Sequence, residues 1–307
     1  MYGATIGACS ILSYEAATNQ ACAAFLPNEN VLPTYLYYFL SSKREQFVKD
    51  GVGGAQPNIS AGYLKNVQFG LIPMQQQIDI VEKLDKVEKL IALRKEQLAK
   101  LDQLVKSRFV ELFGDTPDEE KKTMADICKI ITDGTHQPPK FTSTGIPFLF
   151  VSNIVTNEIH YDAEKFISEE TYAELIKRTP IAIGDILLST VGSYGHPAVV
   201  KSDKPFCFQR HIAYLKPNAD MVNSEYLRGA ILSADVQRQI DERVKGIAQK
   251  TLNLSEIRKL QLPLPSMEQQ EQFAAFVEQT DKSKLAIQYS LNKLELLKKS
   301  LMQKYFG

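Results

Sequence analysis

The sequence lacks the features that mark several common classes of protein. No apolar run is long enough to cross a bilayer, and no basic stretch followed by an apolar one opens the chain. The four cysteines (Cys9, Cys22, Cys128 and Cys207) form no Cys-x-x-Cys pair, which argues against a metal site and against a disulfide framework. We therefore expect a cytoplasmic protein with no membrane segment and no bound metal.

An excess of charge of one sign is also missing. The 36 Lys and Arg residues balance 36 Asp and Glu residues, so the net charge is zero. A protein that holds duplex DNA by itself usually carries a basic excess, because neutralising phosphates supplies much of its affinity. The composition argues against a free-standing DNA-binding protein, but not against a subunit whose partners supply positive charge.

Motifs for catalysis are missing too. The sequence contains no phosphate-binding G-x-x-x-x-G-K-[ST] loop, no Asn-Pro-Pro-aromatic quartet for holding a target amine, and no G-x-S-x-G nucleophile elbow. Asp185, Ser189, Ser193 and His196 lie close enough in sequence to suggest a hydrolase, but nothing else supports that function. We expect no catalytic residue and no cofactor in this chain.

What the sequence does contain is an internal repeat. The segment that ends at Gly114 recurs in the segment that ends at Gly307, and upstream Met74-Gln-Gln-Gln77 falls on Met267-Glu-Gln-Gln270. The match of 55–56 with 248–249 keeps the same register, and further matches have small shifts: 58–60 with 253–255, 35–36 with 226–227, 19–28 with 208–218, and 3–7 with 192–195. One full unit therefore covers about 115–307, and residues 1–114 match only its later part.

Two long helices are predicted, one in each copy. The first follows Pro73 and runs to about Phe113, where Gly114 supplies a stop. The second opens with Ser266, followed three residues later by Gln269 in a capping-box pattern. Each has a narrow apolar stripe of the coiled-coil kind, which favours antiparallel pairing of the two helices. The alternative is that each helix packs on its own domain.

The region between the helices has the pattern of a mixed α/β domain. Strand-like runs occupy 146–151, 185–189, 197–200 and 211–215, and helical runs occupy 169–177 and 224–244. The expected fold class is mixed α+β domains joined by two long helices in an antiparallel coiled coil. The expected domains are 1–73 (a partial first domain), 74–114 (the central long helix), 115–265 (a complete second domain) and 266–307 (the C-terminal long helix).

Several motifs of this chain resemble the target-recognition domain of type I restriction-modification specificity subunits. They are Asp133-Gly-Thr-His136, Gly145-Ile-Pro-Phe-Leu149 with Val151-Ser-Asn-Ile154, Gly184-Asp-Ile-Leu-Leu-Ser-Thr-Val-Gly-Ser193, and the run from Gly246 to Ser255 with Leu262 to Gln270. The resemblance covers essentially the whole chain. It implies a non-catalytic subunit with two recognition domains, each reading one half of a split double-stranded DNA target.

The resemblance also implies partners. Methyltransferase subunits would bind S-adenosylmethionine and methylate adenine, and restriction or motor subunits would use ATP and magnesium. One departure stands out, because the counterpart of about 75–80 residues at the start of the first domain is not in the sequence. A self-dimer or a complementing half-subunit are further expected partners. The alternative function is a truncated or silent-cassette coiled-coil protein without bipartite DNA recognition of its own.

Candidate DNA-contacting residues follow from the loops that carry the resemblance, because base edges and phosphates are contacted mainly by polar and basic side chains. Two interpretations of Arg210 remain open, a bidentate contact with guanine and a structural pair with Asp203. The Asp133-Gly-Thr-His136 loop has a second, architectural interpretation as well. The full set of candidates is Thr135, His136, Gln137, Lys140, Ser152, Asn153, Ser193, Tyr194, His196, Gln209 and Arg210.

Overall fold

A computed structural model describes residues 5–52, 58–114, 116–117, 120–246 and 250–307. The chain divides into two compact units. Unit 1 consists of Met1–Ala99 with Leu285–Gly307, and unit 2 consists of Lys100–Lys284, so each long helix contributes to both. The predicted match of 55–56 with 248–249 lies outside the described residues.

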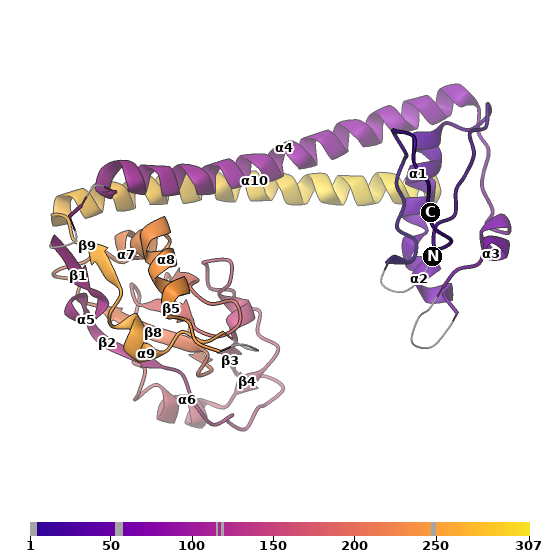
Figure 1. Cartoon of the computed structure of the whole chain (residues 1–307). Helices are drawn as coiled ribbons and strands as arrows, with labels where there is room; N and C mark the ends of the chain where they lie inside the picture. The colour runs from indigo at the N-terminus through magenta and orange to yellow at the C-terminus, as the bar shows by residue number, and fades with distance from the viewer. Residues whose placement is uncertain (1–4, 53–57, 115, 118–119, 247–249) are drawn as a thin grey trace. The chain divides into compact units, whose positions relative to one another are not determined.

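The two long helices are α4 (Met74–Phe113) and α10 (Met267–Phe306), each of 40 residues (Figure 1). At the end of α4, the Gly114 N–H donates to the Val110 carbonyl at 2.8 Å. At the start of α10, Ser266 Oγ accepts from the Gln269 N–H at 3.4 Å, and Gln269 Oε1 accepts from the Ser266 N–H at 3.2 Å. The capping box provides acceptors for backbone N–H groups that have no partner within the helix. Both predicted long helices are confirmed.

Unit 1 pairs the first part of α4 with the last part of α10. Val87 and Ile91 are buried against Leu291, and an ion pair of 3.4 Å joins Lys95 and Glu295. Partners early in α4 meet residues late in α10, so the pairing is antiparallel, as the apolar stripes predict. The other helices of this unit are α1 (Pro33–Ser42), α2 (Arg44–Asp50) and α3 (Ala61–Lys65).

Unit 2 pairs the last part of α4 with the first part of α10, again antiparallel. Asp102 and Lys284 form an ion pair of 2.5 Å. Phe109 lies 5.5 Å from Phe273 between ring centroids, and Phe113 lies 5.2 Å from Tyr226 of α7 (Ser224–Ile231). These aromatic side chains are buried in the main core of the unit, so the two helices close the core of the α/β domain.

The described residues of the α/β domain of unit 2 form three small sheets. Their strand orders are β2-β8-β5-β6, β4-β3-β7 and β1-β9. The strands are β1 (Lys121–Thr123), β2 (Cys128–Asp133), β3 (Ile146–Leu149), β4 (Phe166–Ile167), β5 (Ile186–Ser189), β6 (Pro197–Val199), β7 (Cys207–Phe208), β8 (Ile212–Pro217) and β9 (Gln261–Pro263). The helices are α5 (Met124–Ile127), a 3₁₀ turn η3 (Val151–Asn153), α6 (Glu169–Leu175), α7 (Ser224–Ile231), α8 (Ala234–Arg243) and α9 (Leu254–Ile257).

The four-stranded sheet is buried on both faces. Ile186 and Leu188 of β5 belong to the core that α4 and α10 close, whereas Leu187 faces a second core. Continuous apolar strands are expected where neither face meets water. All four strand-like runs of the sequence are strands in the structure, although their ends differ by up to two residues.

The predicted helical run over 224–244 is corrected by the structure. It is broken into α7 and α8, because Ser233 is extended and its Oγ accepts from the Val236 N–H at 3.4 Å, beginning a new helix. A serine that competes for backbone donors favours a helix start over a helix interior. The run over 169–177 also ends earlier, at Leu175.

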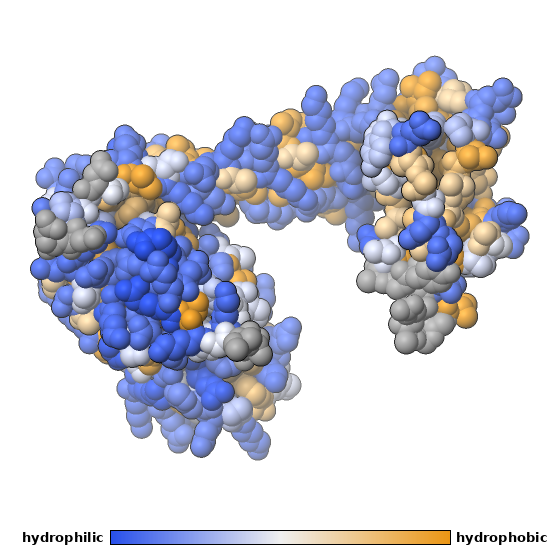
Figure 2. Space-filling model, viewed as in Figure 1, coloured by the Kyte–Doolittle hydropathy of each residue, from blue (hydrophilic) through white to orange (hydrophobic). Residues whose placement is uncertain are grey.

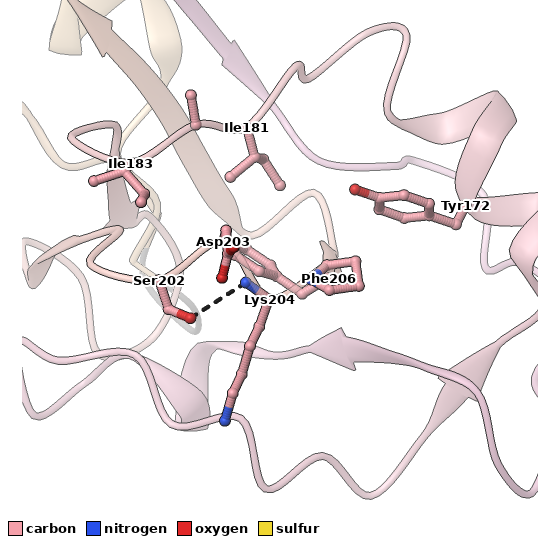
Figure 3. A pocket seen from close by; sticks show the side chains of 9 residues that line it. Tyr172, Ile181, Ile183, Ser202, Asp203, Lys204 and Phe206 are labelled. Carbon is pink, nitrogen blue, oxygen red and sulfur yellow. Dashed lines mark hydrogen bonds between the residues drawn. The ribbon is translucent and has the colours of Figure 1, made fainter.

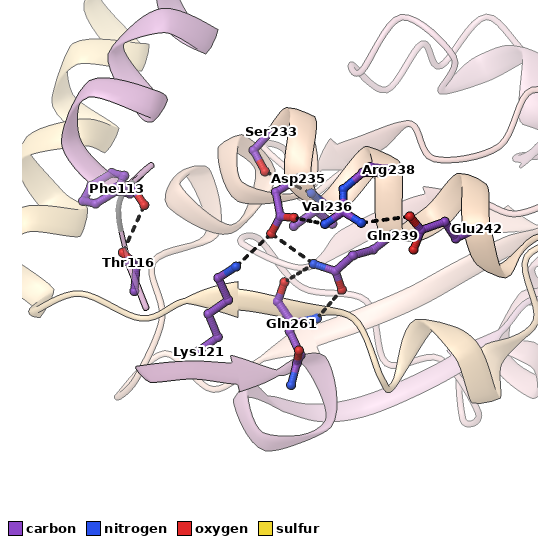
Figure 4. Close-up of polar contacts among 10 residues, drawn as sticks. All are labelled: Phe113, Thr116, Lys121, Ser233, Asp235, Val236, Arg238, Gln239, Glu242 and Gln261. Atoms are coloured by element: carbon purple, nitrogen blue, oxygen red, sulfur yellow. Dashed lines mark hydrogen bonds and ion pairs between the residues drawn. The ribbon is translucent and has the colours of Figure 1, made fainter. Parts of the chain in front are cut away.

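One hydrogen-bond network joins the two-stranded sheet to α8 (Figure 4). The Gln239 side-chain amide donates to the Gln261 carbonyl at 2.8 Å, and its oxygen accepts from the Gln261 N–H at 2.9 Å. Lys121 of β1 reaches Asp235 at 3.1 Å, and Arg238 binds the same carboxylate at 2.7 Å. A glutamine side chain therefore pairs with β9 as a neighbouring strand would.

The internal repeat is visible in the contacts of one buried glutamine in each unit. In unit 1 the Gln77 side chain accepts from the Leu32 N–H at 2.9 Å and donates to the Asn30 and Ile72 carbonyls, each at 2.9 Å. In unit 2 the Gln270 side chain accepts from the Asn223 N–H at 2.8 Å. It also donates to the Met221 and Pro265 carbonyls at 3.1 and 2.9 Å. The repeat predicted from the sequence is therefore a repeat of structure.

None of the helices in the described part of the chain combines the length and apolarity needed to cross a membrane.

Candidate nucleic-acid interface

The predicted DNA-contacting loops meet at one end of the four-stranded sheet of unit 2. Asp133, the last residue of β2, pairs with Ala213 of β8, and Ser189, the last residue of β5, pairs with Ile212. β6 begins at this same end, because it runs antiparallel to β5. The loops over 134–140, 190–196 and 209–211 therefore leave the sheet side by side, although they are far apart in sequence.

Gly134 allows two of these loops to touch through their backbones. A Cβ atom at this position would lie 2.2 Å from the Phe208 carbonyl oxygen and 2.4 Å from that of Gln209. The close approach lets the Thr135 N–H donate to Phe208 at 3.2 Å, and lets the Arg210 N–H donate to Thr135 at 3.1 Å. The glycine of the Asp133-Gly-Thr-His136 motif thus has an architectural role.

The Asp133 side chain stabilises the loop over 134–140. Its carboxylate lies 2.9 Å from His136 Nε2 and forms an ion pair of 2.5 Å with the Arg178 guanidinium. The aspartate is mostly buried, whereas both partners are more than half exposed. His136 is therefore oriented at the surface by the aspartate three residues before it, and Arg178 brings a cation that the sequence alone did not indicate.

The loop over 190–196 is fixed on the other side by residues near 250. The Gly192 N–H donates to the Lys250 carbonyl at 3.2 Å, and the Leu252 N–H donates to Thr190 at 2.8 Å. The Tyr194 hydroxyl donates to Asp241 at 2.9 Å, and the Lys250 ammonium lies 6.0 Å from the centre of the Tyr194 ring. Lys250 therefore lies at the same end of the sheet. In the sequence, only its place in the motif from Gly246 to Ser255 pointed to this residue.

Two histidines of this region, His196 and His211, have pKa values below the ordinary value of a histidine. Burial lowers the pKa of His196, and its Nδ1 lies 3.3 Å from the Asn157 side-chain oxygen. Burial also lowers the pKa of His211, and the neighbouring Arg210 adds to the effect. A neutral imidazole can both donate and accept, so His196 offers hydrogen bonds at this surface without adding charge.

The structure exposes most of the predicted residues but not all of them. Asn153 is buried, and its side chain bonds to the Phe150 N–H at 2.9 Å and to the carbonyls of His160 and Asp162 at 3.1 and 3.3 Å. The Arg210 side chain donates to the His211 ring at 3.4 Å rather than pairing with Asp203. The exposed candidates are His136, Gln137, Lys140, Ser152, Ser193 and Arg210, and the half-buried ones are Thr135, Tyr194, His196 and Gln209.

The residues that suggested a hydrolase do not form a catalytic group. Asp185 precedes β5 at the opposite end from Ser189, and its carboxylate accepts from the Tyr214 hydroxyl at 2.7 Å and from Lys216 at 3.1 Å. The Ser189 hydroxyl accepts from the His196 backbone N–H at 3.0 Å, a contact that shapes the turn. Asp185 therefore cannot orient His196 for proton transfer.

A small hollow of about 130 Å³ lies away from this interface (Figure 3). Ile181 and Tyr172 face it, whereas the Lys204 ammonium points away, and no predicted site residue lines it. Within the described ranges, no group of three or more His, Cys, Asp and Glu side chains is placed to hold a metal ion. The hydrogen-bonding loops at the sheet end therefore remain the candidate site of unit 2.

A mixed α/β domain with polar loops at one sheet end, closed by paired long helices, defines the class of protein. The family model described as "Type I restriction modification DNA specificity domain" matches residues 1–103 and 118–296. The chain belongs to that family.

Two curated relatives are type I restriction enzyme specificity subunits. The EcoBI subunit of Escherichia coli is 25% identical over 284 residues, covering 81% of this chain and 60% of the relative. A protein of Methanocaldococcus jannaschii assigned as the MjaX subunit is 26% identical over 205 residues, covering 63% of this chain and 47% of the relative. The chain thus spans about half to three fifths of the curated relatives it matches.

Solved structures share the fold. A type I restriction-modification S subunit from M. genitalium has a TM-score of 0.56 at 15% identity, covering 91% of this chain and 73% of that chain. A chain from a study of complex assembly and conformational transition of the type I R-M system has a TM-score of 0.55 at 18% identity, covering 89% and 70%. The fold class and internal repeat expected from the sequence are confirmed.

Proposed function

We propose that this chain is the DNA sequence-recognition subunit of a type I restriction-modification complex, and that unit 2 is a reading head. The observation that carries the proposal is the convergence of three loops at one end of the β2-β8-β5-β6 sheet. That surface presents hydrogen-bonding groups of Gln137, Ser193 and Tyr194 beside the cations of Lys140 and Arg210. Such a mixture suits a duplex, where phosphates position the protein and base edges specify the sequence.

The chain's neutral overall charge fits a subunit that shares DNA with partners. Phosphate contacts supply most non-specific affinity, so a chain without a basic excess depends on basic surfaces elsewhere in a complex. We assign those surfaces to methyltransferase subunits that bind S-adenosylmethionine and methylate adenine. Restriction or motor subunits would use ATP and magnesium, and the complex would act in the cytoplasm. In this proposal the present chain performs no chemistry of its own.

The test is DNA binding by the reconstituted complex with single alanine substitutions at Lys140, Tyr194 and Arg210. Replacing a residue that contacts a base edge should weaken the binding free energy by about 1–3 kcal/mol and relax the base preference at one position of the DNA target. Replacing a residue that contacts phosphate should weaken binding to all sequences and should reduce the slope of log affinity against log salt concentration by about 1. Fluorescence anisotropy over a range of salt concentrations separates the two roles.

Lys129→Ala is a matched control. Lys129 lies in β2 near its first residue, at the end of the sheet opposite Asp133, and its ammonium is exposed at 4.0 Å from Asp220. The control should bind DNA as the wild type does. If all three loop variants also match the wild type in affinity, salt slope and sequence preference, the proposed interface is wrong.

A further inference from the structure

Arg178 is a cation at the candidate interface that no motif of the sequence marks. It lies just after α6, and its side chain bonds to the last residue of β2, which is 45 positions earlier in the chain. Guanidinium Nη2 lies 2.5 Å from Asp133 Oδ1 and 3.4 Å from Thr132 Oγ1. The guanidinium therefore lies at the end of the sheet where the predicted DNA-contacting loops leave it.

Exposure alone does not distinguish Arg178 from other polar side chains. Figure 2 shows that most of the visible surface of the α/β domain, drawn at the left, is hydrophilic. What distinguishes Arg178 is its partner, because the Asp133 side chain is only 14% exposed, whereas that of Arg178 is 53% exposed. The other carboxylate oxygen of Asp133 lies 2.9 Å from His136 Nε2, so both oxygens have a partner. A mostly buried carboxylate with fixed contacts restrains the guanidinium that it binds.

Most of the donors of this guanidinium remain available to a ligand. Arginine carries its N–H donors in a planar fork. Among the described residues, Nε and Nη1 of Arg178 have no partner, and the contact of Nη2 with Thr132 is long for a hydrogen bond. Because the side chain is already held in place, a ligand that binds it causes a smaller loss of rotamer freedom. Arg178 is thus positioned to present two parallel donors at the surface.

The Asp133 carboxylate favours a base edge over a phosphate as the ligand of Arg178. Its negative charge offsets the charge of the guanidinium and repels a phosphate, but it leaves the remaining N–H donors in place. Guanine presents two acceptors, N7 and O6, side by side in the major groove, and arginine binds both through two parallel donors. Such a base edge needs donors in a fixed direction more than it needs net charge. The arrangement therefore favours guanine.

We propose that Arg178 reads a guanine in the DNA target of unit 2, and that Asp133 is the positioning residue that holds the guanidinium for this contact. The inference rests on the proposed function of unit 2 as a reading head, and adds to it one base of the target. It also gives Asp133 a role beyond shaping its own loop. The affinity that Arg178 contributes should depend on sequence and only weakly on salt, because the carboxylate already balances its charge.

The experiment measures DNA binding by the complex reconstituted with the modification subunit proposed above. Fluorescence anisotropy is recorded on duplexes that carry the motif methylated by the wild type, and on every single base-pair change in it. Arg178→Ala should weaken binding to the motif about 5- to 100-fold and remove the preference at one G·C pair, as expected for one bidentate base contact. The slope of log affinity against log salt concentration should change by less than about 0.5, because a lost phosphate contact would change it by about 1.

A base analogue and a neighbouring residue provide the controls. At the G·C pair in question, 7-deazaguanine lacks the N7 acceptor, so it should weaken binding by the wild type and leave binding by Arg178→Ala unchanged. Lys177→Ala is the matched variant, because Lys177 is the adjacent residue, is exposed, and loses the same charge. It should bind every duplex as the wild type does. An equal loss of the guanine preference in Lys177→Ala would contradict a specific role for Arg178.

The role of Asp133 is tested by the ratio of affinities for two duplexes that differ only at that G·C pair. This ratio does not depend on how much of the protein is folded. Asp133→Asn should lower the ratio when Arg178 is present, because a neutral amide holds a guanidinium less firmly than a carboxylate does. It should leave the ratio unchanged when Arg178 is already alanine. The same change in both backgrounds, or no change in either, would rule out a positioning role.

The results separate this inference from the proposed function. A complex that binds all duplexes equally would refute both. A complex that prefers one motif, but has no G·C pair whose preference depends on Arg178, would overturn the inference alone. A uniform loss of affinity on all duplexes in Arg178→Ala, with a salt slope lower by about 1, would also overturn it and would assign Arg178 to a phosphate contact.

Discussion

Replacing Gln270 with alanine should destabilise unit 2 much more than an ordinary change on a helix. The buried Gln270 side chain makes three hydrogen bonds, to the Asn223 N–H and to the Met221 and Pro265 carbonyls. Alanine leaves these groups without that partner, and an unsatisfied buried group costs about 1–3 kcal/mol. We expect a total loss of about 3 kcal/mol. For a domain of this size, the melting temperature would fall by about 6–12 °C.

The assay is thermal unfolding followed by hydrogen exchange, which reports the two units separately. Gln272→Ala is the matched control, because Gln272 is exposed on the same turn of α10 and makes one weak contact of 3.5 Å with Glu268. Gln77→Ala should repeat the effect in unit 1, because Gln77 makes the same three bonds there. If Gln270→Ala is no more destabilising than Gln272→Ala, the three hydrogen bonds of Gln270 do not stabilise unit 2 and the account of this repeated contact is wrong.

Two further changes test the packing of the proposed reading head, with Gly70→Ala in unit 1 as a control for the first. Gly134→Ala should destabilise unit 2 by at least about 2 kcal/mol and abolish DNA binding, because the added methyl meets backbone atoms that cannot move cheaply. Gly70→Ala, with nothing within 4 Å, should be nearly silent in a denaturation curve. The lowered pKa of His196 means that the unfolded chain binds more protons as pH falls below about 6.5, so stability should decrease there. His196→Asn should flatten that dependence in melts between about pH 7 and 5.5, and an unchanged slope would contradict the assignment.

The long helices and the repeat could be predicted from the sequence because their signals are local or regular. Ser266 with Gln269 marks a helix start, and the apolar stripe of α4 recurs at three- and four-residue steps. The strands of the main sheet could be found for a similar reason, since continuous apolar runs such as Ile186–Ser189 occur where both faces are buried. The break between α7 and α8 was missed, because Ser233 fits a helix interior as well as a helix start until its partner is known.

The site was only partly predictable, because its geometry depends on contacts between distant residues. Nothing in the sequence shows that Asn153 turns inward to bind three backbone groups, or that Arg178 reaches Asp133 from 45 positions away. The motifs identified the correct loops, but a motif cannot separate a residue that shapes a loop from one that faces DNA. Gly134 and Asp133 shape the loop, whereas the exposed side chains of Lys140 and Arg210 remain predicted DNA contacts.

The central claim is that the loops at one end of the unit 2 sheet read DNA for the complex. The most direct measurement is to map methylated adenines in cells that express this chain with the modification subunit that we propose as its partner, comparing the wild type with a triple variant carrying alanine at Lys140, Tyr194 and Arg210. We predict a defined methylated motif for the wild type, and a motif in the triple variant that is lost or relaxed at some positions. An identical motif, methylated to the same extent in both, would contradict the account.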